Sequence, residues 1–200
     1  MIVEAALALC DAEVEIIDVE WDDLGWSSSV LGELNPLGQL PTLVLPDGSV
    51  MTESAAMLMH LHDAYPQAQL IPATTDPERN TFLRWFVFLV AAVYPTFTYG
   101  DVPKRWVGGD AEAGARLEAG TDDHRKDLYA QLEEAAAGPW FLGDRFCAID
   151  LYLWVMRWWR PGPEWFAGHC PKLSAIGERA LALPAVTSVQ GRNFPDGDTS

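Results

Sequence analysis

Residues 34–61 read LNPLGQLPTLVLPDGSVMTESAAMLMHL, and this stretch decides the fold. Thr42–Leu45 is a short apolar run with β-branched residues, which predicts a buried strand. The sequence PDG at 46–48 is a tight-turn signal, and residues 49–51 return as a second strand, so the two runs form a hairpin. A helix begins at 52–54, where two hydroxyls and a Glu suit a helix N-terminus.

The same stretch carries groups that could bind a small peptide. Pro41 biases Leu40 toward an extended conformation, and a cis bond between them would turn the backbone groups of Leu40 outward. The helix start offers N–H groups and a positive field to a carboxylate, while Glu53 suits an amino group. Each feature alone is ordinary turn chemistry. Together and in this order they favour a site for a small zwitterionic peptide.

Residues 35–61, NPLGQLPTLVLPDGSVMTESAAMLMHL, resemble the glutathione-binding half of the glutathione S-transferase family. That family has Asn-Pro, a Gly, a cis-Pro, and then Glu-Ser opening a helix. The resemblance implies that the residue before the cis-Pro clamps the cysteinyl backbone of glutathione, and that the Glu-Ser pair holds its γ-glutamyl end. It therefore implies a glutathione site made of Leu40, Pro41, Glu53 and Ser54, with Gln39 more weakly involved.

The resemblance also predicts the domain organisation. We expect an α+β thioredoxin-like domain at 1–66, with its first strand missing, and an all-α helical domain at 77–200. Tyr65–Asp76, with two prolines and small polar residues, is the expected linker. The remaining expected elements are a helix over 1–9, a strand over 13–19, a loop over 21–32, a helix ending near 64, and helices over 78–96 (kinked or ended by Pro95), 110–137 (broken near Gly120), 146–159, 171–183 and from 184.

The segment GDRFCAID, residues 143–150, resembles the family's helix-capping motif. The family normally has Ser or Thr at the position of Cys147, and Asp150 would hold the far side of the cap. A thiol is a poorer acceptor than a hydroxyl, so we expect somewhat reduced local stability and an unchanged fold.

Composition narrows the functional class. With 200 residues, 49% hydrophobic and 21% charged, the chain is globular and long enough for a real core. The net charge of −16 argues against nucleic acid and anionic membranes as partners. Three dispersed cysteines and no signal peptide indicate a reducing cytoplasm. The apolar run Trp85–Tyr94 is about half of what a bilayer requires.

Other polar residues give weaker signals. His60 and His62 point to different helix faces and His169 has only Cys170 beside it, so no metal site is expected. Cys10 lies at the far end of its helix and is interpreted as a core residue, although some bacterial relatives use a cysteine near there. A weak substrate pocket, equally well explained as packing or dimer surface, is suggested for Tyr94, Tyr99, Lys104, Arg105 and Trp106.

The resemblance does not reach the family's catalytic group. In the family a first strand and a loop precede the first helix, and that loop carries the Ser, Tyr or Cys that activates the glutathione thiol. This sequence starts inside that helix, so no catalytic residue is assigned. We expect 13–19 to pair directly with 42–45, another chain to supply a strand, or the protein to begin upstream of Met1. The third is favoured, with little conjugating activity for the 200-residue chain.

Three functions follow from these observations. The leading one is conjugation of glutathione, as co-substrate, to a small apolar electrophile, as in detoxification, or a related glutathione-dependent reaction by a homodimer without cofactor or metal. The second is a non-catalytic glutathione-binding or interaction module on the same fold. The third is a thiol-disulfide reductase that acts through a cysteine.

Overall fold

The structure is a computed structural model that describes residues 1–20, 24 and 31–195. It divides into two compact units, Met1–Leu70 and Ile71–Ser200. The division falls inside the stretch 65–76 that the sequence predicts as a linker. Most of the loop expected at 21–32 lies outside the described residues.

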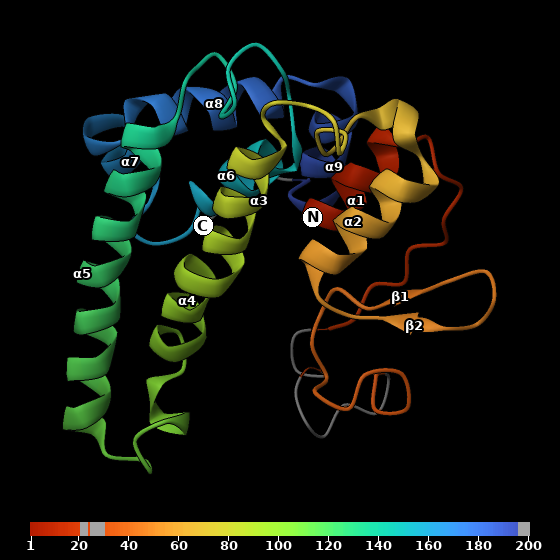
Figure 1. Ribbon diagram of the computed structural model, residues 1–200. Helices are drawn as coiled ribbons and strands as arrows, with labels where there is room; N and C mark the ends of the chain where they lie inside the picture. Colours follow the sequence, from red (N-terminus) through yellow and green to blue (C-terminus); the bar gives the residue numbers. More distant parts are fainter. Residues whose placement is uncertain (21–23, 25–30, 196–200) are drawn as a thin grey trace. The chain divides into compact units, whose positions relative to one another are not determined.

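The first unit combines two packed helices with a small hairpin (Figure 1). Two helices contact each other through side chains that are fully buried, such as Ala5, Ala6, Met57 and Leu58. The helix near the N-terminus and the helix after the hairpin are both confirmed. The elements are α1 (Ile2–Leu9), β1 (Leu43–Val44), β2 (Val50–Met51), α2 (Ser54–Ala64) and the short 3-10 helix η2 (Pro66–Ala68).

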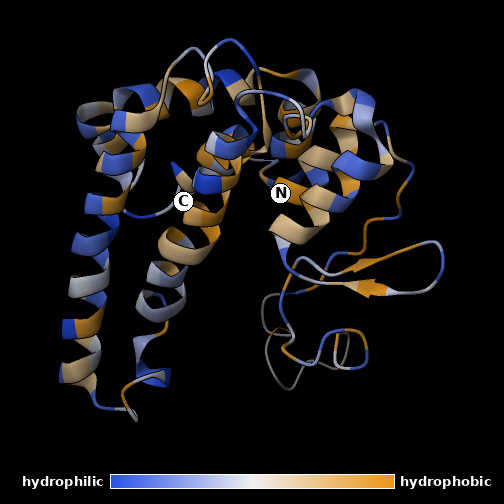
Figure 2. Cartoon of the chain, in the orientation of Figure 1, coloured by the Kyte–Doolittle hydropathy of each residue, from blue (hydrophilic) through white to orange (hydrophobic). Residues whose placement is uncertain are grey.

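The β1–β2 hairpin forms as its sequence predicts, but the expectation that its first strand is buried is wrong, because Val44 is 51% exposed. The strands are antiparallel, with Leu43 opposite Met51 and Val44 opposite Val50. The Asp47 carboxylate accepts the backbone N–H of Ser49 at 2.9 Å, and Gly48 takes a φ of 83° that a side chain would disfavour. Figure 2 shows apolar residues on both strands.

The strand expected over 13–19 is wrong. This segment has no strand structure and does not pair with β1, since the described residues form one two-stranded sheet. Its apolar side chains are exposed, with Ile17 at 71%. High β-propensity is not sufficient here, because an extended segment is stable only when a neighbouring strand satisfies its backbone groups. A cavity of about 520 Å³ lies within the first unit, and its lining includes residues 12–15 and 42–46.

The elements of the described part of the second unit are helices, apart from one isolated β-bridge between Trp140 and Gly143, and the unit buries a large aromatic and aliphatic core. All nine residues of its α6 helix are buried, and α6 packs against α8, while α4 packs against α5 (Figure 1). Its elements are α3 (Arg79–Phe88), a π-helical segment η3 (Leu89–Val93), α4 (Tyr94–Gly100), the 3-10 helix η4 (Pro103–Arg105), α5 (Ala111–Ala135), α6 (Ala148–Met156), α7 (Pro163–His169), α8 (Pro171–Leu181) and α9 (Pro184–Asn193).

Pro95 does not end the helical stretch in which it lies. It is within the first two residues of α4, directly after the π-helical segment, where its missing N–H is tolerated. The helical stretch Arg79–Gly100 is therefore continuous over 22 residues, and by length and composition alone it could cross a membrane, which corrects the shorter estimate from sequence. This is weak evidence, because a core helix passes the same test, and Phe82, Phe86 and Leu89 are fully buried here.

Three other helix expectations need correction. α5 runs unbroken through Gly120, because one exposed Gly costs only about 1 kcal/mol in a long helix. α6 ends at Met156 rather than near Trp159. α7 was missed in the sequence, although Gly162 and Pro163 form a helix-start signal there.

The capping motif at α6 forms as predicted. Cys147 is the N-cap residue, and a capping box joins it to Asp150. The Asp150 carboxylate accepts the backbone N–H of Cys147 at 2.7 Å and that of Phe141 at 2.9 Å. Burial raises the pKa of the Asp150 carboxyl to about 7, although these two hydrogen bonds oppose the shift.

Candidate functional site

A buried asparagine organises the loop that carries residues 39–41. Asn35 is 3% exposed, and its Nδ2 donates to the backbone carbonyl of Gln39 at 2.9 Å and to Thr42 Oγ1 at 3.2 Å. Its Oδ1 accepts the backbone N–H of Leu37 at 3.1 Å. Thr42 Oγ1 donates to the same Gln39 carbonyl at 2.9 Å. From the sequence, Asn35 was interpreted only as a turn residue. Its position four residues before Gln39 was the one feature that could have indicated a hydrogen bond between them.

The loop presents its residues to solvent. Gln39, Leu40 and Pro41 are all exposed, with Leu40 at 47%. The Leu40–Pro41 bond is cis, which confirms the sequence prediction.

The hairpin register places the two halves of the expected peptide site at one end of the sheet. Leu43 pairs with Met51, so the residues just before β1 and just after β2 lie at the same open end of the hairpin. The pairing ends at Leu43 and Met51, so Pro41 and Glu53 each lie two residues beyond the paired part of the hairpin at this end.

Glu53 has an unusual backbone at the start of α2. Its φ is 66°, in the left-handed region that residues other than Gly, Asn and Asp seldom adopt. It occupies the N-cap position, makes no side-chain capping hydrogen bond, and is exposed, while Ser54 is the first helical residue and half-buried. Such backbone strain is concentrated at ligand-binding positions, so the conformation supports a functional role. The hydroxyl cap expected from the sequence is not what begins this helix.

The weak substrate-pocket residues divide into two groups. Tyr94 packs its ring against Tyr152 and Trp159, and burial raises the pKa of its hydroxyl well above the ordinary value. Tyr99 and Trp106 are 42% and 51% exposed, and their rings pack edge to face with 4.8 Å between the ring centroids. Exposed positions in or beside η4 are also occupied by Lys104 and Arg105.

The three cysteines are poor nucleophiles in this fold. All are buried, and burial raises the pKa of Cys10 to about 11 and that of Cys170 to about 12, with Cys147 raised as well. A thiolate is the reactive form, so these thiols are held in their inert state. Cys10 is 3% exposed, as its interpretation as a core residue requires. The described part of the chain contains no group of three His, Cys, Asp or Glu residues that could hold a metal.

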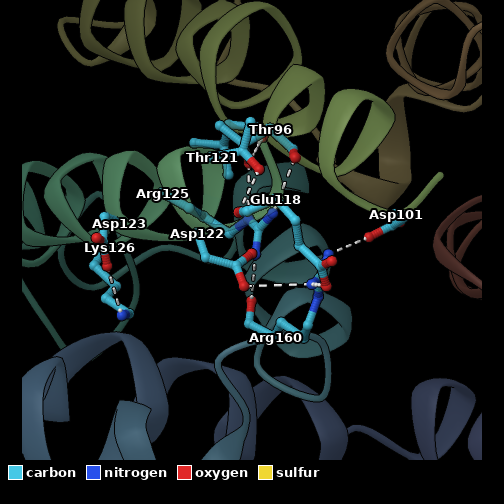
Figure 3. Close-up of polar contacts among 10 residues, drawn as sticks. Thr96, Asp101, Glu118, Thr121, Asp122, Asp123, Arg125, Lys126 and Arg160 are labelled. Carbon is cyan, nitrogen blue, oxygen red and sulfur yellow. Dashed lines mark hydrogen bonds and ion pairs between the residues drawn. The ribbon is translucent and has the colours of Figure 1, made fainter. Parts of the chain in front are cut away.

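A partly buried ion network, which no sequence pattern indicated, lies in the second unit (Figure 3). The guanidinium of Arg125 is fully buried, pairs with Asp122 at 2.7 Å, and donates to Thr96 Oγ1 at 2.8 Å and to the Thr96 carbonyl at 3.0 Å. It also lies 3.8 Å from the ring centre of Phe97. Arg160 extends the network to Asp101, Glu118 and Asp122. These contacts tie α4 and α5 to the segment after α6.

Comparisons with known proteins agree with this geometry. Residues 2–64 match the family model for the glutathione S-transferase N-terminal domain. An uncharacterised GST-like protein of Escherichia coli, YncG, is 39% identical over 192 residues, which are 95% of this chain and 91% of the relative. Glutathione S-transferase GST-4.5 of Xanthomonas campestris is 32% identical over 170 residues, 80% and 79% of the two chains.

Solved structures show the same fold. A sphingomonad glutathione S-transferase complexed with glutathione is 26% identical, with a TM-score of 0.75 over 94% of this chain and 90% of that one. A glutathione transferase homologue from Sulfitobacter with bound glutathione has a TM-score of 0.82 at 21% identity, over 96% and 92% of the two chains, and supports the fold alone. One explanation accounts for the cis-proline loop, the hairpin, the opening of α2 and the helical second unit: the chain belongs to the glutathione S-transferase family.

Proposed function

We propose that the chain binds glutathione at the open end of the β1–β2 hairpin and conjugates it to a small apolar electrophile. The sphingomonad glutathione S-transferase, 26% identical to this chain, has been solved in complex with glutathione. The observation that carries the proposal is the meeting of an exposed backbone, at Leu40 and Pro41, with Glu53 and the start of α2 at one end of the hairpin.

Each end of glutathione has a chemical counterpart in this arrangement. The backbone of Leu40, in a loop exposed to solvent, can pair with the cysteinyl backbone. The α-carboxylate of the γ-glutamyl group suits the N–H groups at the start of α2, with Ser54 adding a hydroxyl. The amino group suits the Glu53 carboxylate. Gln39 is adjacent and contributes less, because its carbonyl already accepts two hydrogen bonds inside the protein.

The reaction would form a carbon–sulfur bond. The glutathione thiol gives its proton to solvent, the thiolate attacks the electrophilic carbon, and either a leaving group departs with its electron pair or, in an addition, the carbanion that forms takes up a proton from solvent. The free thiol pKa of about 8.5 must fall for this step to be fast at neutral pH. The exposed Tyr99–Trp106 pair, with Arg105 beside it, is the proposed surface for the electrophile, and the buried Tyr94 hydroxyl supports it only through packing.

The second candidate function is a glutathione-binding module without catalysis. It is favoured by one observation, that no described residue is assigned to activate the glutathione thiol, and that the three cysteines and the Tyr94 hydroxyl are withdrawn from solvent, with pKa values raised by burial. The same observation argues against a thiol-disulfide reductase, which needs a reactive thiolate.

One pair of measurements separates the candidates. Purified chain is titrated with glutathione by calorimetry and then assayed for glutathione conjugation to 1-chloro-2,4-dinitrobenzene. Binding together with conjugation above the uncatalysed rate supports the transferase, and binding without conjugation supports the module. Absence of glutathione binding contradicts both.

We further propose that the chain works as a cytoplasmic homodimer. The helix over 79–100 leaves the apolar side chain of Val87 50% exposed, and family members are usually dimeric. The expected interface exceeds about 1,000 Å². Light scattering at micromolar concentration should give twice the monomer mass of 22.1 kDa, and a monomer mass would contradict the proposal.

A further inference from the structure

The hydrogen-bonding groups of Asn35 are fully used inside the protein. Its amide donates twice and accepts once, its backbone N–H donates to the Leu31 carbonyl at 2.6 Å, and its own carbonyl accepts from Gly38 at 2.8 Å. A buried polar side chain with every bond made has one strongly preferred position. Asn35 is thus a rigid internal support for the loop around it.

The target of that support is one carbonyl group. The Gln39 carbonyl accepts hydrogen bonds from both Asn35 Nδ2 and Thr42 Oγ1, each at 2.9 Å. One donor, Asn35, stands four residues before Gln39 in the sequence, and the other, Thr42, stands three residues after it. The direction of the Gln39 carbonyl is therefore fixed by side chains rather than by a strand or helix.

Fixing this carbonyl also fixes the next N–H group. The Gln39–Leu40 bond is not among the cis bonds of the described chain, so it is trans. In a planar trans peptide the carbonyl and the N–H point in opposite directions. With the carbonyl directed inward at Asn35 and Thr42, the N–H of Leu40 is directed away from them. No acceptor for it is recorded among the described residues, and Leu40 is 47% exposed.

We propose that Asn35 and Thr42 are positioning residues that aim the Leu40 N–H at a carbonyl oxygen of glutathione. This inference rests on the proposed function and deepens it. Neither side chain needs to touch glutathione. Their effect is preorganisation: the N–H already has its bound direction, so binding does not have to order it.

The test removes one of the two anchors without removing volume. Thr42→Val is nearly isosteric and deletes Oγ1. The Gln39 carbonyl then loses one donor, and Asn35 Nδ2 loses one of its two acceptors. Thr42→Ser keeps the hydroxyl. Thr187→Val is the matched control, because Thr187 is an exposed threonine in α9 with the same type of bond to backbone carbonyls. Asn35→Asp provides a second perturbation, since a carboxylate cannot donate to Gln39. Glutathione Kd is measured by calorimetry, and the Gln39 carbonyl ¹³C shift is measured without ligand.

The expected results differ between variants. Thr42→Val should weaken glutathione binding about three- to tenfold, which corresponds to one hydrogen bond. Its Gln39 carbonyl resonance should move upfield, and Thr42→Ser should restore both readouts. Thr187→Val should change neither, and Asn35→Asp should weaken binding at least as much as Thr42→Val. A role limited to stability would lower the melting temperature without this pattern.

Three outcomes would overturn the inference, each in a different way. If wild type binds glutathione and Thr42→Val binds it equally well, the positioning role is wrong while the proposed function stands. If wild type binds no glutathione, both are wrong. A Gln39 carbonyl shift that does not respond to Thr42→Val contradicts the geometry itself.

Discussion

Replacing Asp150 with Asn should change stability in a way that depends on pH. Asp150 is fully buried at the start of α6, and its carboxylate accepts two backbone N–H groups, from Phe141 and Cys147. Asn has the same shape but only one acceptor oxygen, so one of these N–H groups then faces an amide NH₂. The cost of one unsatisfied buried donor is about 1–3 kcal/mol.

Ionisation of Asp150 destabilises the wild-type protein, so at higher pH it offsets the cost of the substitution. Burial raises the pKa of Asp150 to about 7 in the folded protein, against 3.8 for the ordinary carboxyl. The fold therefore prefers the neutral form, and this contribution to stability is complete below about pH 4 and is lost as pH rises toward 7. At about 1.4 kcal/mol for each pKa unit, wild type loses roughly 3 kcal/mol between pH 5 and pH 8 from this group. An Asn side chain does not titrate and loses nothing.

The assay is urea unfolding at pH 5 and pH 8, followed by tryptophan fluorescence. Of the nine tryptophans only Trp21 and Trp26 lie outside the helical unit, so the signal reports on that unit. Asp150→Asn should destabilise by about 1–3 kcal/mol at pH 5 and by much less, or not at all, at pH 8. The control Asp144→Asn alters an exposed carboxylate nearby and should have little effect at either pH. An equal cost of Asp150→Asn at both pH values would refute the raised pKa.

Three further predictions concern single side chains. Glu53→Ala or Ser54→Ala should weaken glutathione binding by about 1–3 kcal/mol through a lost charge-assisted hydrogen bond, and unchanged affinity in calorimetry would place the site elsewhere. Cys147→Ser should raise the free energy of unfolding by about 0.5–1 kcal/mol, because a hydroxyl is the better N-cap acceptor, and lower stability in urea would contradict this. Arg125→Met should lower it by about 3–5 kcal/mol, while Lys126→Met, at a half-exposed side chain, changes it little; an equally small change for both variants would show that the network contributes no stability.

The parts of the fold that local sequence determines were predictable. The hairpin, α1, α2 and the capping box each follow from neighbouring residues, such as the turn at 46–48 and the Cys147–Asp150 spacing. Family membership and the two-part fold also follow from the motif at 35–61. The Leu40–Pro41 cis bond was predictable only because the pattern around it resembles a known family.

Features that depend on distant partners were not predictable. Residues 13–19 have strand-forming composition, yet a strand needs a paired neighbour, which their sequence does not specify. Pro95 is tolerated because a π-helical segment precedes it, and no residue pattern announces that segment. Arg125 looks like a surface residue in an acidic helix, and only the approach of α4 buries it. Asn35 reads as turn chemistry until its donors are seen to reach Gln39 and Thr42.

The central claim is that glutathione binds at the open end of the β1–β2 hairpin. The most direct test is a glutathione titration of ¹⁵N-labelled protein, with the amide resonances of the first unit assigned. The account predicts saturable shifts that are largest at Leu40, Glu53 and Ser54, with the Leu40 amide proton moving downfield as it gains an acceptor. A titration that leaves these three amides unchanged, or that shifts only residues of the helical unit, would contradict it.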